Sequence, residues 1–504
     1  MRNWSRKETD LVGLDWVERF LEWDFLSAGV PNLAVQSIGG ETVNSLTAEL
    51  ARDNQHKIMA SMRGRIDRDV FQRLLPDKGI TPGGEKTHFS VVCTDGPRSV
   101  ILSNCTTANS VQSLSGDPLS QVEIGLTVDS IARSTGDTET PAATTDWYLN
   151  GPAVGAFIWP RVTERRCHGR YVRTRTCSDC ESLVSVEYPA TDDPMSRLLS
   201  PDHLLVTLDS VGAIVSKVPE HLSPSWSAGL GLEFRRELGG IPDEETRNAI
   251  AEALSFLLGR QLLYIGFTSF DSQGQPVEEG AVGPWGDDVV ATCQAPGWPP
   301  LKPPWEPEQS EYMLSSLIQS YVSLRNELDL SDVLWAYWVG LRMPVGFELP
   351  LFGLALERLM DAWFRSNRSK SRGVYIPSDV FDQLTREPFV EVEKRLGGFE
   401  YADRMMRRMR WAFQMGVNER FEAFFEELGL TLGQTEQLAL KRRNRCAHGG
   451  PVNPNQLREH IRLARTYQAL VHRVLLRVLG YTGPYIDYGT LGFPEKALDE
   501  CAGS

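Results

Sequence analysis

The strongest constraint on the fold lies in the last third of the chain, where helical patterning is almost continuous from residue 309 to residue 479. Good helix formers fill these segments, and apolar residues recur every three or four positions, as at Leu457, Ile461 and Ala464. Each such helix has an apolar stripe that it can bury only against its neighbours. We therefore predict an all-α bundle for residues 309–504. Its helices are expected at 309–327, 330–342, 348–367, 378–396, 399–415, 417–428, 432–447 and 454–479.

The residues before the bundle differ in composition and pattern from the helical segments. Short β-branched segments such as "HFSVVCTD" and "QVEIGLTV" are separated by Gly, Pro, Asp and Ser, which is typical of an antiparallel sheet. A helix capped by Asp243 is expected to run to about Leu258. The fold class is therefore α+β and multidomain. The expected parts are a β-rich sensing or regulatory domain at 1–200, an α+β region at 201–295, a Pro-rich linker at 296–308 and the helical domain at 309–504.

The linker is set by six prolines between Pro296 and Pro307. Proline favours the extended polyproline II conformation, so we expect a stiff spacer with Trp298 and Trp305 as docking points. Whether residues 1–300 form one domain or two stays open.

A cysteine cluster at 161–182 is a candidate metal site. Cys177 and Cys180 form a C-x-x-C pair ten residues after Cys167, with His168 alongside. Three thiolates and one imidazole suit tetrahedral zinc, so a structural zinc site is one interpretation. Adjacent residues seldom ligate one ion, so the site is expected to use Cys167 or His168 and a ligand from elsewhere. A redox pair and plain reduced cysteines are the alternatives.

Bulk properties limit the partners of the chain. A net charge of -14 argues against general adhesion to nucleic acid, so RNA has to be bound by a local basic surface. No run approaches the roughly 18 apolar residues of a membrane span, and the first residues lack a signal-peptide pattern. Eight cysteines in 504 residues do not form a secreted disulfide framework. We expect a cytoplasmic protein with reduced thiols and no membrane partner.

The segment Lys441–Gly450, "KRRNRCAHGG", carries the most informative group of polar residues. The helix predicted over 432–447 is stopped by the Gly-Gly-Pro that follows, which places His448 at a helix C-terminus. Asn444 and His448 are four residues apart and share a face, with Arg443 beside them. A fixed cation, an amide and an imidazole that titrates near neutral pH suit a phosphodiester. The alternative is a set of ordinary dipole-complementing caps.

With a long helix on either side and "LGYTGPYIDYGTLGFP" after it, this segment resembles the HEPN superfamily, whose signature is an Arg, a polar residue and a His within a few positions. It looks most like the C-terminal HEPN domain of ApeA-type bacterial anti-phage proteins, over residues 305–504. The resemblance implies a dimer with both motifs in one cleft, and an endoribonuclease that needs no metal ion. It implies acid or base catalysis for His448, phosphorane stabilisation for Arg443 and positioning for Asn444.

Two further groups are expected to support this motif. Glu357 lies where related HEPN domains often carry an acidic helix residue, and it is a candidate for orienting Arg443 or His448, with a plain surface carboxylate as the alternative. The candidate RNA-binding residues are basic positions of two helices, which together would line one groove: Lys441, Arg442, Arg445, Arg404 and Arg408. The alternative for the arginines is ion pairing with nearby carboxylates: Glu419, Glu422, Glu426 and Glu427.

A free RNase would kill its host, so residues 1–300 are expected to restrain or trigger the HEPN domain. The resemblance implies tRNA or mRNA as substrate, a phage component as trigger and abortive infection as the outcome. Catalysis is expected to need no cofactor. Two alternatives stay open: a non-catalytic HEPN scaffold that binds RNA or protein, and a HEPN toxin silenced by a separate antitoxin.

Overall fold

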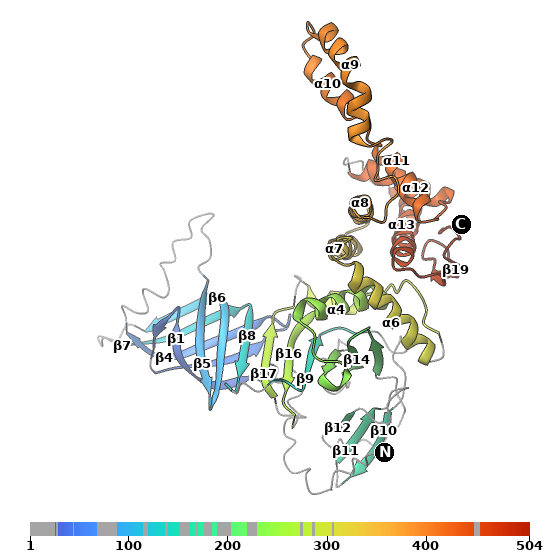
Figure 1. The fold of residues 1–504 in the computed structure, drawn as a ribbon. Coiled ribbons are helices and arrows are strands. Elements are labelled where there is room, and N and C mark those ends of the chain that lie inside the picture. Colours follow the sequence, from blue (N-terminus) through green and yellow to red (C-terminus); the bar gives the residue numbers. More distant parts are fainter. Residues whose placement is uncertain are drawn as a thin grey trace. The chain divides into compact units, whose positions relative to one another are not determined.

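The computed structural model contains two compact units (Figure 1). The first comprises most of the chain up to residue 315, and the second comprises residues 316–504 together with 248–259 and 299–302. The structure describes residues 26, 29–43, 45–67, 88–113, 119–136, 140–151, 162–167, 170–175, 184–188, 203–218, 229–272, 276–284, 288–304, 307–447 and 454–503.

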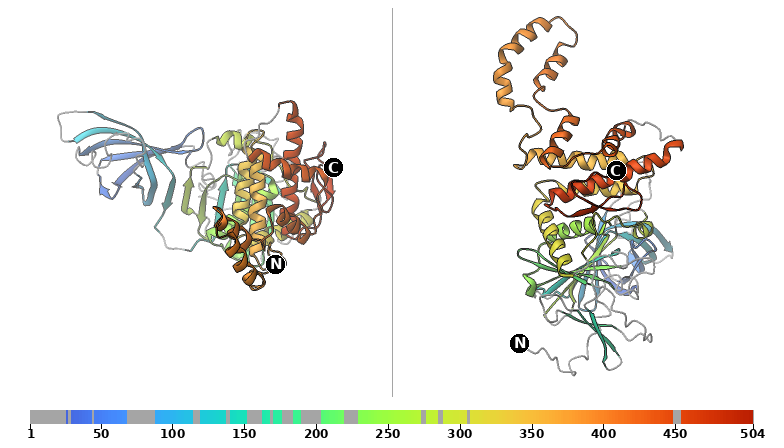
Figure 2. Two further views of the ribbon diagram at one scale, coloured as in Figure 1. Left: turned by 90° about the horizontal axis from the view of Figure 1, so that it is seen from above. Right: turned by 90° about the vertical axis from the view of Figure 1, so that its right-hand side faces the viewer.

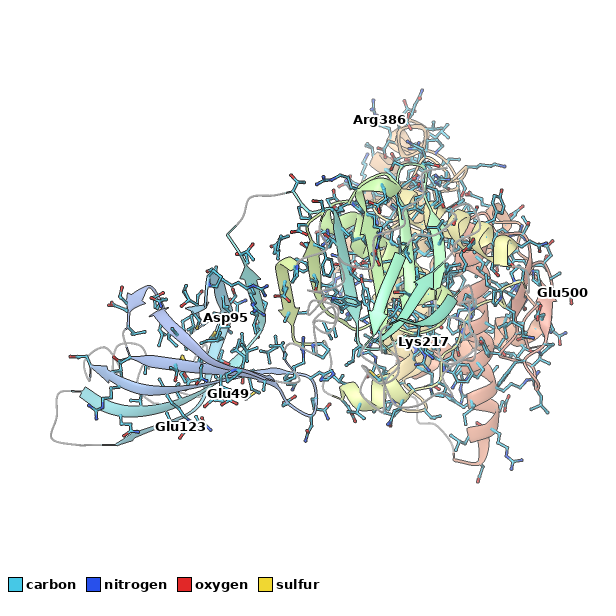
Figure 3. All side chains as sticks on the ribbon, turned by 90° about the horizontal axis from the view of Figure 1, so that it is seen from below. Glu49, Asp95, Glu123, Lys217, Arg386 and Glu500 are labelled. Atoms are coloured by element: carbon cyan, nitrogen blue, oxygen red, sulfur yellow. The ribbon has the colours of Figure 1, made fainter. Side chains whose placement is uncertain are left out.

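Six antiparallel strands of the first unit close into a barrel, in the order β1-β3-β4-β7-β6-β5 and back to β1. In β3, Leu46, Ala48 and Leu50 are buried, whereas Glu49 between them projects outwards, as does Glu123 of β7 (Figure 3). This two-residue period fills the interior with apolar side chains. The strands are β1 (Val30–Ile38), β3 (Leu46–Arg52), β4 (Ile58–Asp67), β5 (Phe89–Asp95), β6 (Arg98–Ser113) and β7 (Leu119–Val128), with the short β2 (Glu41–Thr42) paired to β1.

The same sheet continues beyond the barrel through β8 (Ser130–Ser134), which pairs with β6 and with β17. From β8 the strand order is β17-β16-β9-β15-β14-β13. The sheet therefore crosses the expected division at residue 200, because β9 pairs with both β15 and β16. These strands are β9 (Ala143–Tyr148), β13 (His203–Thr207), β14 (Gly212–Lys217), β15 (Leu230–Arg235), β16 (Tyr264–Phe270) and β17 (Pro276–Val282).

Two helices and a small sheet accompany these strands. Helix α4 (Glu244–Leu258) begins where the sequence predicts, since Asp243 accepts a hydrogen bond from the Thr246 amide at 2.8 Å. Helix α5 (Val289–Gln294) is capped in the same way by Asp288. The three-stranded antiparallel sheet contains β10 (Val162–Cys167), β11 (Arg170–Arg175) and β12 (Val184–Tyr188).

The second unit is helical, as its patterning predicts. Helices α7, α8, α12 and α13 pack together, and α13 is buried around almost its whole circumference. This confirms the coarse α+β class, with strands before the helical region. The helices of this unit are α7 (Leu330–Arg342), α8 (Glu348–Arg365), α9 (Ser378–Leu396), α10 (Ala402–Arg410), α11 (Val417–Glu427), α12 (Gln434–Ala447) and α13 (Leu457–Val478). Residues 248–258 of α4 and 316–324 of α6 (Pro307–Leu324) also belong to this unit. Within the described residues, no helix is both long and apolar enough to cross a membrane.

Helices α9 and α10, residues 378–410, form a helical hairpin that we call the arm. The arm projects from the other helices of this unit (Figures 1 and 2). α9 has no buried residue, and α10 buries only Met406. The arm therefore offers most of its side chains to solvent.

The C-terminal residues fold back on α12 and α13 as a small cap that contains β18 (Pro484–Ile486) and β19 (Glu495–Ala497). The buried Asp487 carboxylate accepts hydrogen bonds from the Gly489 and Gly503 amides at 2.8 and 2.9 Å. Part of the expected Pro-rich linker is bound here, because the Pro299 carbonyl accepts from Tyr488 Oη at 2.7 Å and the Pro300 carbonyl from the Ile486 amide at 2.9 Å. Residues 299–302 of the expected stiff linker are thus part of the helical unit.

Candidate functional site

Helix α12 positions the Arg of the sequence motif. Its first turn is closed by Glu436, whose carboxylate accepts from the Gly433 amide at 2.8 Å, as in a capping box. Glu436 also forms a fully buried ion pair with Arg473 of α13. Glu436, Ala439 and Arg443 recur at three- and four-residue spacing, so one face of α12 is directed into the bundle. This fixes the rotation of α12 about its axis.

Arg443 contacts two neighbouring helices, α8 and α11. Its Nη1 lies 2.7 Å from Oε1 of Glu357 on α8, and its guanidinium lies over the Phe421 ring of α11, 5.2 Å from the ring centroid. Gly353, one turn before Glu357, leaves room for the Arg443 stem, since a Cβ there would lie 2.0 Å from Cδ. The expected proximity of Glu357 to Arg443 is thus present in the structure.

The burial of this ion pair is asymmetric. The Arg443 side chain is 8% exposed, whereas that of Glu357 is 38% exposed. Burial raises the pKa of the neighbouring Tyr467 phenol well above its ordinary value, and the Arg443 charge opposes that increase. The cation is therefore fixed in the bundle, and solvent reaches the pair through the carboxylate.

The other residues of the motif are described only in part. Asn444 and Arg445 belong to α12, and the structure describes their backbone but not their side chains. His448 lies outside the described residues. The structure therefore places Arg443 and Glu357 together, while the expected position of His448 beside them stays a prediction.

The candidate RNA-binding residues belong to two different parts of the helical unit. Lys441 is exposed and Arg442 is half-buried on α12, which packs against α8 and α13. Arg404 and Arg408 are exposed on α10, which packs against α9 in the arm. Helix α10 lies in the arm and α12 lies among the other helices of the unit (Figure 1), whereas one groove lined by residues of both helices was expected.

Two of the carboxylates that were alternative partners for the arginines, Glu419 and Glu427, have other contacts. Glu427 accepts hydrogen bonds from Trp363 Nε1 at 2.8 Å and from the Ser371 amide at 2.9 Å. These and other donors lower the pKa of Glu427 against the effect of its burial. Glu419 accepts from the Gly416 amide at 2.7 Å and closes the first turn of α11. Both are engaged in local structure instead of neutralising α10.

The candidate zinc ligands cannot be placed from the described residues. Cys167 ends β10 and is opposite Arg170 in the β10–β11 register, but its side chain is not described. His168, Cys177 and Cys180 lie outside the described residues. Among the cysteines whose side chains are described, the buried Cys93 and Cys105 are free thiols. The zinc interpretation stays a prediction.

Three comparisons with known proteins add nothing to this geometry. No protein-family model, curated protein or solved structure matches the chain. The HEPN interpretation consequently rests on the motif, its helical setting and the contacts of Arg443.

Sequence reasoning did not identify Phe421, Tyr467 or Gly353 as parts of this site. Phe421 and Tyr467 look like ordinary core aromatics of amphipathic helices, so no local signal distinguishes them. Gly353 did carry a signal, because a glycine inside the apolar helix segment "LFGLALER" often marks a close approach.

Proposed function

We propose that this protein is a metal-independent endoribonuclease with Arg443, Asn444 and His448 in its catalytic site. The observation that supports this proposal best is the fixed Arg443 guanidinium, which pairs with Glu357 and packs on the Phe421 ring. Arg443 precedes His448 by five residues in the sequence. A preorganised cation stabilises charge as it develops in a transition state without first having to be ordered. Transesterification of RNA needs a cation that stabilises the charged phosphorane and a group that transfers protons, and an oriented Arg with a titratable His supplies both.

In the proposed reaction the ribose 2′-oxygen attacks the adjacent phosphorus while a base removes the 2′-hydroxyl proton. The P–O5′ bond breaks, and an acid donates a proton to the departing 5′-oxygen. The products are a 2′,3′-cyclic phosphate and a 5′-hydroxyl end. His448 takes the base or acid role, Arg443 stabilises the phosphorane charge and Asn444 positions the phosphate. DNA lacks the attacking hydroxyl and is not a substrate.

The burial of Arg443 restricts how a phosphate reaches it. Because solvent reaches the pair through Glu357, the phosphate approaches on that side and competes with the carboxylate for the guanidinium. A second copy of the helical unit would bring a second His448 to the same cleft, which gives one histidine for each of the two proton transfers. We therefore propose that the active form is a homodimer.

The unit that contains the barrel is proposed to restrain the nuclease until a phage component is sensed, with abortive infection as the outcome. The support for these separate roles is that the barrel strands and the helices around Arg443 belong to different compact units. Zinc, if bound in the cysteine cluster, would have a structural role in the first unit.

A non-catalytic scaffold is the second candidate, and the burial of Arg443 favours it. A buried Arg paired with a Glu and stacked on a Phe also occurs as a plain structural contact. In that case Arg443 stabilises the bundle, and RNA or protein is bound elsewhere.

Cleavage assays separate the two candidates. The purified full chain is incubated with cellular tRNA and mRNA in EDTA, alone and with lysate of phage-infected cells. We expect cleavage by the wild type, and loss of it in His448→Ala and in Arg443→Ala. His88→Ala, which removes an exposed histidine of the first unit, is the matched control and should cleave normally. Cleavage that persists in His448→Ala, or no cleavage in either condition, favours the scaffold.

A further inference from the structure

One face of α10 combines exposed aromatic and basic side chains. Tyr401 precedes the helix and Trp411 follows it, and they are 54% and 57% exposed. Between them Arg404, Met405 and Arg408 recur at three- and four-residue spacing, so all five side chains lie along one face. Two aromatics, a methionine and two arginines thus form one exposed face that is both aromatic and basic.

These five residues and Arg407 line a groove of about 720 Å³. Its lining includes three arginines and no carboxylate. Arg410 of the same helix differs, because it pairs with Glu393 of α9 at 3.7 Å and does not line the groove. Within the part of the chain that the structure describes, Arg404, Arg407 and Arg408 form no ion pair. The groove is therefore a local positive surface on a chain whose net charge is -14.

The two rings are held in place by the arm. Trp411 stacks on Phe413, with 6.2 Å between ring centroids and 17° between ring planes. Phe413 in turn packs against Phe381 of α9 at 5.4 Å. At the other end, the Arg404 guanidinium lies 5.4 Å from the centroid of the Tyr401 ring. Since Phe413 covers one face of Trp411 and the side chain is still more than half exposed, its other face is open to a planar ligand.

We propose that this groove binds a single strand of nucleic acid, with bases stacked on Tyr401 and Trp411 and phosphates paired with the arginines. Aromatic rings interleaved with arginines are the usual means of binding single strands without sequence preference. Ten residues of helix separate the two rings, which is about 15 Å at 1.5 Å per residue. That length fits about four stacked nucleotides at 3.4 Å each. An acidic protein would pair with the arginines but leave the open rings unused.

Fluorescence anisotropy of labelled oligonucleotides with the full chain tests this proposal. The probes are an RNA of about 12 nucleotides with 2′-O-methyl riboses and a DNA of the same sequence. Neither can undergo the proposed 2′-hydroxyl attack, so the assay is independent of the proposed nuclease. We expect both single strands to bind, and pairing into a duplex to weaken binding because the base faces are then covered.

Four variants separate stacking from charge. Trp411→Ala should weaken binding at least about fivefold, and Trp411→Phe should restore most of it. Arg404→Ala combined with Arg408→Ala should reduce the salt dependence, the slope of log K against log salt, by about 1.4. Arg410→Ala is the matched control and should bind as the wild type. Circular dichroism of each variant checks that the arm is folded.

Equal affinity of wild type and folded Trp411→Ala for single strands would overturn the proposal. So would preferential binding of a polyglutamate peptide that Trp411→Ala leaves unchanged, since it would identify the groove as a surface for an acidic protein.

Discussion

The variant Gly353→Ala is expected to displace the Arg443 side chain without changing any charged group, so it tests the position of Arg443 alone. A Cβ at Gly353 would lie 2.0 Å from Cδ and 2.7 Å from Cγ of Arg443. Carbon atoms in contact are about 3.5–4.0 Å apart, so the Arg443 stem has to move by about 1.5 Å. The side chain is 8% exposed and has little free space to move into. It therefore cannot keep both its 2.7 Å contact with Glu357 and its place over Phe421.

The expected energy change follows from opposing effects. Alanine is a better helix former than glycine by about 1 kcal/mol, which would stabilise α8 if the space were free. Overpacking a core costs about 1–3 kcal/mol, and separating a buried charge from its partner costs about 3–5 kcal/mol. Because Glu357 is 38% exposed, water replaces part of the lost interaction. We expect a net destabilisation of about 2 kcal/mol, or a melting temperature lower by about 4–8 °C for a unit of this size.

A double-mutant cycle measures whether the clash involves Arg443. Urea unfolding is followed for the wild type, Gly353→Ala, Arg443→Ala and the double variant. With the Arg443 stem removed, Gly353→Ala should become neutral or stabilising by up to about 1 kcal/mol. Destabilisation of equal size in both backgrounds would refute the packing described for Arg443. In the nuclease assay, Gly353→Ala should lose activity although it changes no charged group.

Two further predictions concern buried charge in the helical unit. Burial lowers the pKa of His472 from its ordinary value of 6.5 to about 3. Between these two pH values the unfolded chain therefore binds more protons than the folded chain. The contribution of His472 to stability is full above pH 6.5, and the free energy of unfolding falls by roughly 4 kcal/mol as the pH drops to 3. His472→Gln should remove that part of the pH dependence, and an unchanged profile of melting temperature against pH would contradict it. Glu436→Gln leaves Arg473 buried without its counter-ion and should cost about 3–5 kcal/mol in urea unfolding. The exposed pair Glu391–Arg395 is the control, where Glu391→Gln should cost less than about 0.5 kcal/mol, and similar costs at both positions would be inconsistent with this reasoning.

Helix positions could be predicted well because their signals are local. The expected ranges 330–342 and 378–396 coincide with α7 and α9, where apolar periodicity and end signals agree. Helix α10 begins at Ala402 instead of residue 399, because two successive turns precede it: the Leu396 carbonyl accepts from the Phe399 amide, and the Phe399 carbonyl accepts from the Ala402 amide. Pairing between distant strands has no such local signal. The division at residue 200 was expected from local composition alone, whereas β9 pairs with strands about 85 and 120 residues further along the chain.

The site could be predicted in part for the same reason. Arg443 stands out through its spacing to Asn444 and His448, and Glu357 through the HEPN resemblance. Their contact depends on the packing of α8 against α12, which brings together residues far apart in sequence. The aromatic groove of the arm was missed because Tyr401 and Trp411 fall inside the helix expected at 399–415, where aromatics commonly belong to the buried face. Only the structure shows that the arm leaves them exposed.

The chemistry of the RNA ends produced in EDTA decides whether this protein cleaves by 2′-hydroxyl attack. Wild type and His448→Ala are compared on one RNA, and on the same RNA with a single 2′-deoxy nucleotide at the cleaved position. We expect 2′,3′-cyclic phosphate and 5′-hydroxyl ends from the wild type alone, and no cut at the deoxy position. Ends with a 5′-phosphate, or cleavage at the deoxy position, would contradict the proposed reaction and the roles assigned to Arg443 and His448.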